Sequence, residues 1–137
     1  MIKETDYLIV GAGAMAMAFA DTILKEQPNS TIALVEKRSA PGGHWLDAYP
    51  YVRLHQPASF YGVNSEKLET HSGDLSSKQE ILAYYSRVLY RMENAGRVKF
   101  FGMMEHTGKG NVRSIVDPNK KIKFRIKKRL VDSTYMK

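Results

Sequence analysis

The residues best suited to chemistry form a glycine-rich turn close to the N-terminus. Residues 11–16 read Gly-Ala-Gly-Ala-Met-Ala, which fits the pattern G-x-G-x-x-A. Gly11 permits a tight turn, Gly13 lets a diphosphate approach the bare backbone, and Ala16 keeps the following helix close to its strand. The free N–H groups of the first helical turn, at Ala14, Met15 and Ala16, then face the negative charge of the diphosphate.

An acidic residue follows this turn at the sequence separation expected for a dinucleotide-binding site. Glu36 lies 20 residues after Ala16, where a carboxylate accepts hydrogen bonds from the hydroxyl groups of an adenosine ribose. The basic neighbours Lys37 and Arg38 suit the 2′-phosphate of NADP, but the charge of Glu36 repels that phosphate, and Lys37 is expected to contact the cofactor. The alternative is an ordinary glycine turn beside a surface glutamate.

The elements that position these residues form one strand–helix–strand unit over residues 5–36. Tyr7–Val10 is a short apolar run typical of a buried parallel strand. A helix is expected from Ala14 to about Glu26, and Thr31–Val35 is predicted to be a second strand, parallel to the first. The sequence therefore predicts an α/β domain of the Rossmann-like class.

Beyond Glu36 the pattern becomes irregular and then regular again. Residues 37–76 are rich in Gly, Pro, Ser, His and aromatic side chains, as in a loop that wraps a ligand. A helix is predicted over 77–95, from a capping box of Ser77 and Glu80 to Gly96, and a strand of the same sheet over 97–102. A small antiparallel β-meander is predicted over 111–134. Its three strands are expected at about 112–116, at about 121–126 and from Leu130 to Thr134.

Length and composition exclude several classes of function. The chain has 137 residues and is expected to form a single domain, residues 1–137. It has no cysteine, which excludes disulfides and thiolate chemistry, and no metal site is predicted. No apolar run reaches membrane-spanning length and no signal peptide is evident, so we expect a cytoplasmic protein without membrane contact.

The net charge of +7 is concentrated near the C-terminus. Charged and apolar residues alternate strictly over residues 121–127, which predicts a strand with one face in water. We therefore expect no nucleic-acid partner, because no aromatic side chain shares the solvent face with the lysines. A basic interaction protein with a vestigial site stays open as an alternative.

The segment after Glu36 carries a resemblance to a known family. Gly42, Gly43, His44 and Trp45 are followed by Tyr-Pro-Tyr-Val-Arg at residues 49–53. Over residues 5–61 the chain resembles flavin-containing and Baeyer–Villiger-type monooxygenases, within the FAD/NAD(P)-dependent oxidoreductases. The resemblance implies that FAD is the cofactor and that the Gly-Gly-His-Trp loop passes close to it. Arg53 and His55 are the only catalytic candidates, and Leu54-His55-Gln56 stands where many Baeyer–Villiger enzymes have an acid.

The same resemblance implies that the chain is an N-terminal, incomplete FAD-binding domain. Relatives carry a second glycine fingerprint for NADPH or NADH, and none follows residue 16 here. The chain stops at Val131-Asp132-Ser133-Thr134-Tyr135, about where the meander should lead back to the sheet. We expect a truncated product, a fragment or a subunit completed by a second chain, which is not fully active alone. The alternative is a non-catalytic dinucleotide- or ADP-binding module.

Overall fold

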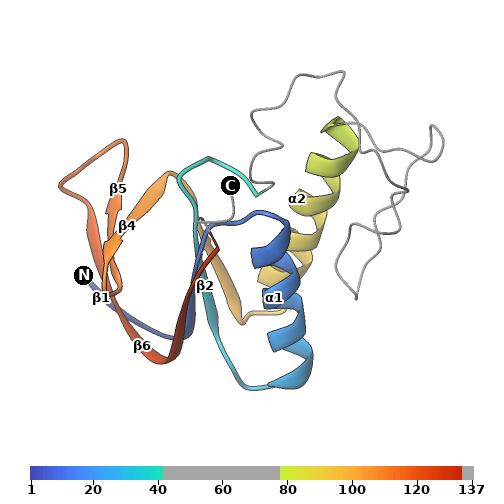
Figure 1. The fold of residues 1–137 in the computed structure, drawn as a ribbon, viewed down its shortest axis with the longest axis horizontal. Helices are drawn as coiled ribbons and strands as arrows, with labels where there is room; N and C mark the ends of the chain where they lie inside the picture. The colour runs from blue at the N-terminus through green and yellow to red at the C-terminus, as the bar shows by residue number, and fades with distance from the viewer. Residues whose placement is uncertain (42–77, 134–137) are drawn as a thin grey trace.

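The structure is a computed structural model that describes residues 1–41 and 78–133. Within these residues lie two helices and a six-stranded sheet of order β3-β2-β1-β6-β5-β4 (Figure 1). In chain order the elements are β1 (Ile2–Val10), α1 (Ala14–Glu26), β2 (Ile32–Val35), α2 (Lys78–Asn94), β3 (Val98–Phe101), β4 (Met104–Gly108), β5 (Asn111–Ser114) and β6 (Lys121–Asp132). The predicted α/β, Rossmann-like fold class is confirmed.

The parallel part of the sheet is built from short apolar strands. β1 pairs with β2 from Tyr7 to Val10, and β2 pairs with β3 along its whole length. Both helices cover the same face of these strands (Figure 1). The core between them contains buried side chains from every one of these elements, among them Ile9, Leu34 and Tyr84. Burial of this apolar face is what holds α1, and therefore its N-terminus, against the sheet.

The ends of both helices are defined by local hydrogen bonds. α1 follows Gly13 and closes at Gln27, whose N–H donates to Ile23. The guanidinium of Arg97 then donates to backbone carbonyl oxygens at this end of α1, including that of Leu24 at 2.6 Å. α2 ends at Asn94, and Gly96 adopts a φ of 86°, as expected for a C-terminal cap. Ser77 of the predicted capping box lies outside the described residues.

The other face of the sheet is covered by the hairpin of β4 and β5 together with the first half of β6. β4 and β5 are antiparallel, and β5 pairs with residues 121–123 of β6. Ile122 and Phe124 are buried against Leu8 and Val35, whereas Lys121 and Lys123 are exposed. The predicted alternation of charged and apolar residues in this segment is therefore confirmed.

β1 and β6 run side by side in parallel and turn sharply near their midpoints (Figure 1). Their register shifts there, because Thr5 pairs with Ile126 and Tyr7 with Arg129. A shift of this kind is a β-bulge, which bends a strand and increases its twist. The first halves of both strands join the hairpin layer, and the second halves join the parallel sheet.

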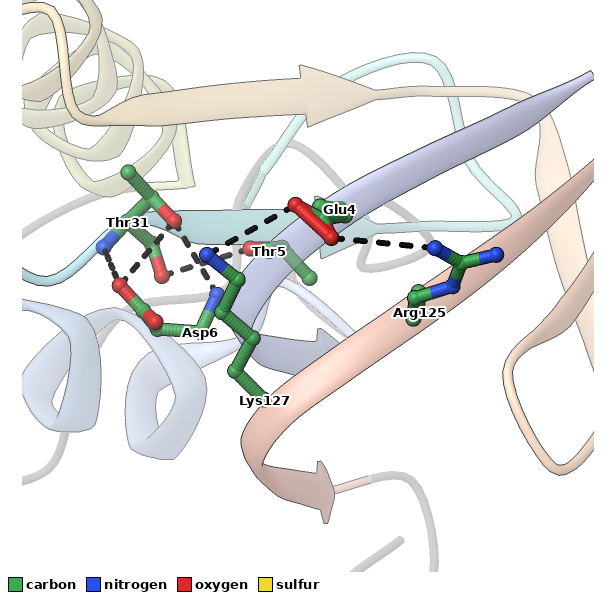
Figure 2. A network of polar contacts seen from close by, with 6 residues as sticks. All are labelled: Glu4, Thr5, Asp6, Thr31, Arg125 and Lys127. Atoms are coloured by element: carbon green, nitrogen blue, oxygen red, sulfur yellow. Dashed lines mark hydrogen bonds and ion pairs between the residues drawn. The ribbon is translucent and has the colours of Figure 1, made fainter.

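Polar contacts fix this corner (Figure 2). Lys127, which the bulge leaves without a strand partner, lies 3.7 Å from the carboxylate of Glu4. On the opposite side of β1, the carboxylate of Asp6 accepts a hydrogen bond from the N–H of Thr31 at 2.9 Å. Asp6 in turn donates its own N–H to the Thr31 hydroxyl at 3.1 Å. The corner is thereby tied to the segment that leads from α1 into β2.

The structure corrects the predicted strands in three respects. The strands expected at about 121–126 and at Leu130–Thr134 are one continuous strand, β6, because the bulge bends it without breaking it. The first strand begins at Ile2, since β6 supplies a partner for its polar half. A strand at 104–108 precedes the predicted start of the meander at 111.

The meander also leads back to the sheet, which the sequence did not predict. β6 occupies the position beside β1 and pairs with it as far as Asp132. Residues 42–76 of the predicted cofactor-wrapping loop lie outside the described residues. The domain boundaries 1–137, and the expectation of an incomplete domain, stay predictions.

Candidate functional site

The glycine turn connects the carboxyl end of β1 to the N-terminus of α1. Gly11 has a φ of 100°, a conformation that favours glycine over any other residue. Its N–H donates to the carbonyl oxygen of Val35 at 2.7 Å, and the next N–H, of Ala12, donates to Glu36 Oε1 at 2.8 Å. Two successive amides of the turn are thus held by the end of β2.

The first turn of α1 has backbone donors that are unpaired among the described residues. The first α-helical hydrogen bond runs from the N–H of Met17 to the carbonyl of Gly13. Within the described part of the chain, no hydrogen bond is made by the N–H groups of Ala14, Met15 and Ala16. The first turn contains no acidic side chain, and both Ala14 and Met15 are exposed. The positive end of the helix dipole is therefore open to an anion.

Glu36 lies directly beyond β2, next to this turn. Its side chain is 5% exposed, and its two carboxylate oxygens accept hydrogen bonds from the N–H groups of Ala12 and Arg38, at 2.8 and 2.9 Å. The Arg38 guanidinium lies 3.8 Å from Oε2. The two backbone donors fix the direction of the carboxylate, and the guanidinium compensates part of its charge. A carboxylate has about four acceptor positions, and the two backbone N–H groups fill two of them.

The chain between β3 and β4 packs against the segment that follows Glu36. Met103 donates its N–H to the carbonyl of Arg38 at 3.0 Å, and Met104 donates to the carbonyl of Glu36 at 3.0 Å. A Cβ atom at Gly102 would lie 3.3 Å from the carbonyl oxygens of Arg38 and Ser39. The hairpin layer thus supports the loop that carries the carboxylate.

Charged residues of the hairpin lie near this loop. A hydrogen bond from Arg113 and its positive charge lower the pKa of Glu105 below its ordinary value, and Lys37 adds a smaller effect of the same sign. Lys37 itself is exposed. Lys37 lies at the edge of the candidate site, whereas the carboxylate of Glu36 points into the glycine turn.

The other predicted site residues cannot be placed in this geometry. Gly42, Gly43, His44, Trp45, Arg53 and His55 lie outside the described residues. Their roles stay predictions. Among the residues that the structure does describe, no group of three or more histidine, aspartate or glutamate side chains could hold a metal ion.

Sequence reasoning missed two contributors to the site. The first is the backbone N–H of Arg38, which holds Glu36 from the side opposite Ala12. The second is Ser133, whose hydroxyl donates to the carbonyl of Val10 at 2.8 Å. No local signal marks Ser133, since its contact depends on how β6 pairs with β1.

Comparison with known proteins identifies the fold. Residues 9–61 match the model of a family described as an NAD(P)-binding Rossmann-like domain. Over this range the chain is similar to that family. Its glycine turn, α1, β2 and Glu36 all lie inside the matched range.

The chain is similar in sequence to several curated proteins, one of which is named a probable FAD-binding monooxygenase. It is 40% identical to an uncharacterised protein of Mycobacterium tuberculosis, over 98% of this chain and 26% of that protein. It is 31% identical to the probable FAD-binding monooxygenase AlmA of Acinetobacter baylyi, over 73% of this chain and 20% of that protein. The predicted resemblance is confirmed, and the chain spans about a quarter of the length of these relatives.

A solved structure agrees in fold. The cyclohexanone monooxygenase from Rhodococcus sp. Phi1, bound to NADP⁺, superposes with a TM-score of 0.70 at 19% identity. The match covers 98% of this chain and 26% of that enzyme. At this identity the likeness concerns the fold alone. In the described residues, no helix is long and apolar enough to cross a membrane.

Proposed function

We propose that this chain binds the adenosine diphosphate half of FAD and forms the N-terminal, FAD-binding part of a monooxygenase-like oxidoreductase. The observation that carries the proposal is the buried carboxylate of Glu36. It is fixed by two backbone N–H groups and lies beside the N–H groups that open α1, which have no partner in the described part of the chain. A ribose and a diphosphate require these two features side by side.

The described residues fit each part of this ligand. The N–H groups of Ala14, Met15 and Ala16 bind the diphosphate, and Gly13 leaves the backbone accessible. The remaining acceptor positions of Glu36 bind the ribose hydroxyl groups. Because both oxygens are already held by backbone donors, the carboxylate cannot turn away, and its charge disfavours a 2′-phosphate at this position.

FAD is favoured over NAD by the relatives. AlmA is named a probable FAD-binding monooxygenase, and the loop with Gly42, Gly43, His44 and Trp45 is proposed to lie beside the same cofactor. Bound FAD would supply the redox chemistry, and the protein contributes binding, orientation and exclusion of water. A substrate site and a reductant such as NADPH or NADH would be supplied in a full-length relative or by a partner chain.

Thermal unfolding of the 137-residue chain with FAD, NAD or ADP tests the proposal. We expect FAD and ADP to raise the melting temperature, because a ligand that binds only the folded state stabilises it. The variant Glu36→Gln should show a smaller rise relative to its own ligand-free form. Glu26→Gln changes an exposed glutamate at the end of α1 and should respond like the wild type. The absence of a shift with all three ligands would refute the proposal.

A second candidate ligand is a nicotinamide dinucleotide. It is favoured by the description of the matched family, an NAD(P)-binding domain. A shift with NAD that clearly exceeds the shift with FAD would select it. Equal shifts with ADP and FAD, without retained yellow flavin after gel filtration, would instead indicate a module that uses only the adenosine diphosphate.

A further inference from the structure

Ser133, the residue directly after β6, holds the last carbonyl group of β1. Its N–H donates to the carbonyl oxygen of Val10 at 3.0 Å, and its hydroxyl donates to the same oxygen at 2.8 Å. Val10 and Asp132 are strand partners. The end of β6 therefore lies beside the point where β1 passes into the glycine turn, 123 positions away in the sequence.

The peptide unit between Val10 and Gly11 is consequently held at both ends. Its carbonyl oxygen accepts both hydrogen bonds from Ser133, and its N–H, which belongs to Gly11, donates to Val35 at 2.7 Å. The following amide, of Ala12, donates to Glu36 at 2.8 Å. Gly11, with a φ of 100°, is the joint between these two fixed amides. The course of the turn is thus set from β2 on one side and from β6 on the other.

The hydroxyl of Ser133 adds a contact that the strand ladder does not supply. A carbonyl oxygen has two acceptor positions, and the Ser133 N–H fills one of them as any strand residue except proline would do. The hydroxyl fills the second and resists rotation of the peptide plane. Such rotation would move Gly11 and Gly13 relative to the open N–H groups of α1. Holding a binding site in its bound geometry raises affinity, since less freedom is lost on binding.

We propose that Ser133 is a positioning residue for the diphosphate subsite. It acts through the Val10 carbonyl and does not touch the ligand. This inference rests on the proposed function, because it assumes that the glycine turn binds a diphosphate. Its role is distinct from that of Glu36, which reaches the ribose directly.

Binding measurements with two ligands separate positioning from general stability. The ligands are ADP, which needs the turn, and adenosine, which lacks the diphosphate, titrated into the 137-residue chain and followed by NMR. We expect Ser133→Ala to raise the Kd for ADP about three- to tenfold, the range of one net hydrogen bond. The Kd for adenosine should stay within about twofold. Ser133→Thr, which keeps the hydroxyl, should behave like the wild type.

The control is Ser86→Ala, which changes an exposed serine on α2. Its affinities for both ligands should equal those of the wild type. An unchanged Kd for ADP in the Ser133→Ala variant would overturn the inference. Equal losses for ADP and adenosine would overturn it as well, because they indicate a structural effect without a preference for the diphosphate.

Amide hydrogen exchange without ligand provides an independent test. We expect the amides of Gly11 and Ala12 to exchange several-fold faster in Ser133→Ala than in the wild type. The amide of Val88, buried in the middle of α2, should be unchanged. Unchanged exchange at the turn overturns the positioning role whatever the ligand does. If the wild-type chain does not bind ADP, the proposed function is overturned. Amide hydrogen exchange at Gly11 and Ala12 is then the only test of the role of Ser133.

Discussion

Glu36 should stabilise the ligand-free protein as well as bind ribose, and Glu36→Ala measures this contribution. The substitution leaves the N–H groups of Ala12 and Arg38 without their charged acceptor. A hydrogen bond to a charged group contributes about 1.5–3 kcal/mol. The N–H of the fully buried Ala12 accounts for the larger part of the lost stability. Water can replace the acceptor at the half-buried Arg38, so its N–H accounts for less. The sum is a loss of about 3 kcal/mol in the free energy of unfolding.

Urea unfolding followed by circular dichroism measures this loss without any ligand. For a chain of this size, 3 kcal/mol corresponds to a fall of roughly 10 °C in melting temperature. Glu36→Gln should lose about half as much, since its amide oxygen still serves one N–H while its amide nitrogen faces the other. Glu26→Ala, which removes an exposed glutamate, is the control. If Glu36→Ala and Glu26→Ala unfold with free energies within about 0.5 kcal/mol of each other, the carboxylate does not hold the turn.

Three further substitutions test other parts of the fold. Arg97→Ala removes hydrogen bonds to the carbonyl groups at the end of α1 and should cost about 2 kcal/mol in urea unfolding, of which Arg97→Lys restores a part. Gly110→Ala should cost more than Gly96→Ala: both glycines have positive φ, but only at Gly110 would the new Cβ lie 2.7 Å from a carbonyl oxygen, that of Phe124. An equal loss in both variants would contradict the clash. Burial raises the pKa of Tyr85 from 10.0 to about 12, so its stabilising contribution is present below pH 10 and lost as the pH rises toward about 12. Between pH 10 and about pH 12, the free energy of unfolding should fall by about 2 kcal/mol less in Tyr85→Phe than in the wild type. The urea midpoint at each pH measures this difference.

The proximity of the glycine turn and Glu36 was predictable because the signals for both are local. Gly11 and Gly13 follow an apolar strand, and Glu36 ends the next one, so pairing of the two strands brings these residues together. The roles of the Arg38 amide and of Ser133 were not predictable. A backbone donor has no sequence signature, and the contact of Ser133 requires knowledge of the partner of β6.

The corner of β1 and β6 shows what limited the prediction of the fold. No glycine or proline lies near Lys127 and Lys128 in the sequence to indicate a bend. The break in alternation after residue 127 therefore indicated the end of a strand, whereas the chain bulges and continues. In the same way Lys3, Glu4 and Asp6 resemble a polar tail, and only pairing with β6 makes them part of a strand.

The pairing of β1 with β6 also affects the order in which the contacts of this fold can form during synthesis. β1 and β6 are the first and last strands among the residues that the structure describes, and their pairing joins positions 2–10 to positions 123–132. During synthesis, α1, β2 and the second half of β1 can associate early, while Ile2 and its neighbours wait for β6 to leave the ribosome. Contacts between such distant segments form late, because closing a long loop costs chain entropy before any contact repays it. Ser133 follows β6, so the glycine turn acquires this restraint only after β6 has been made.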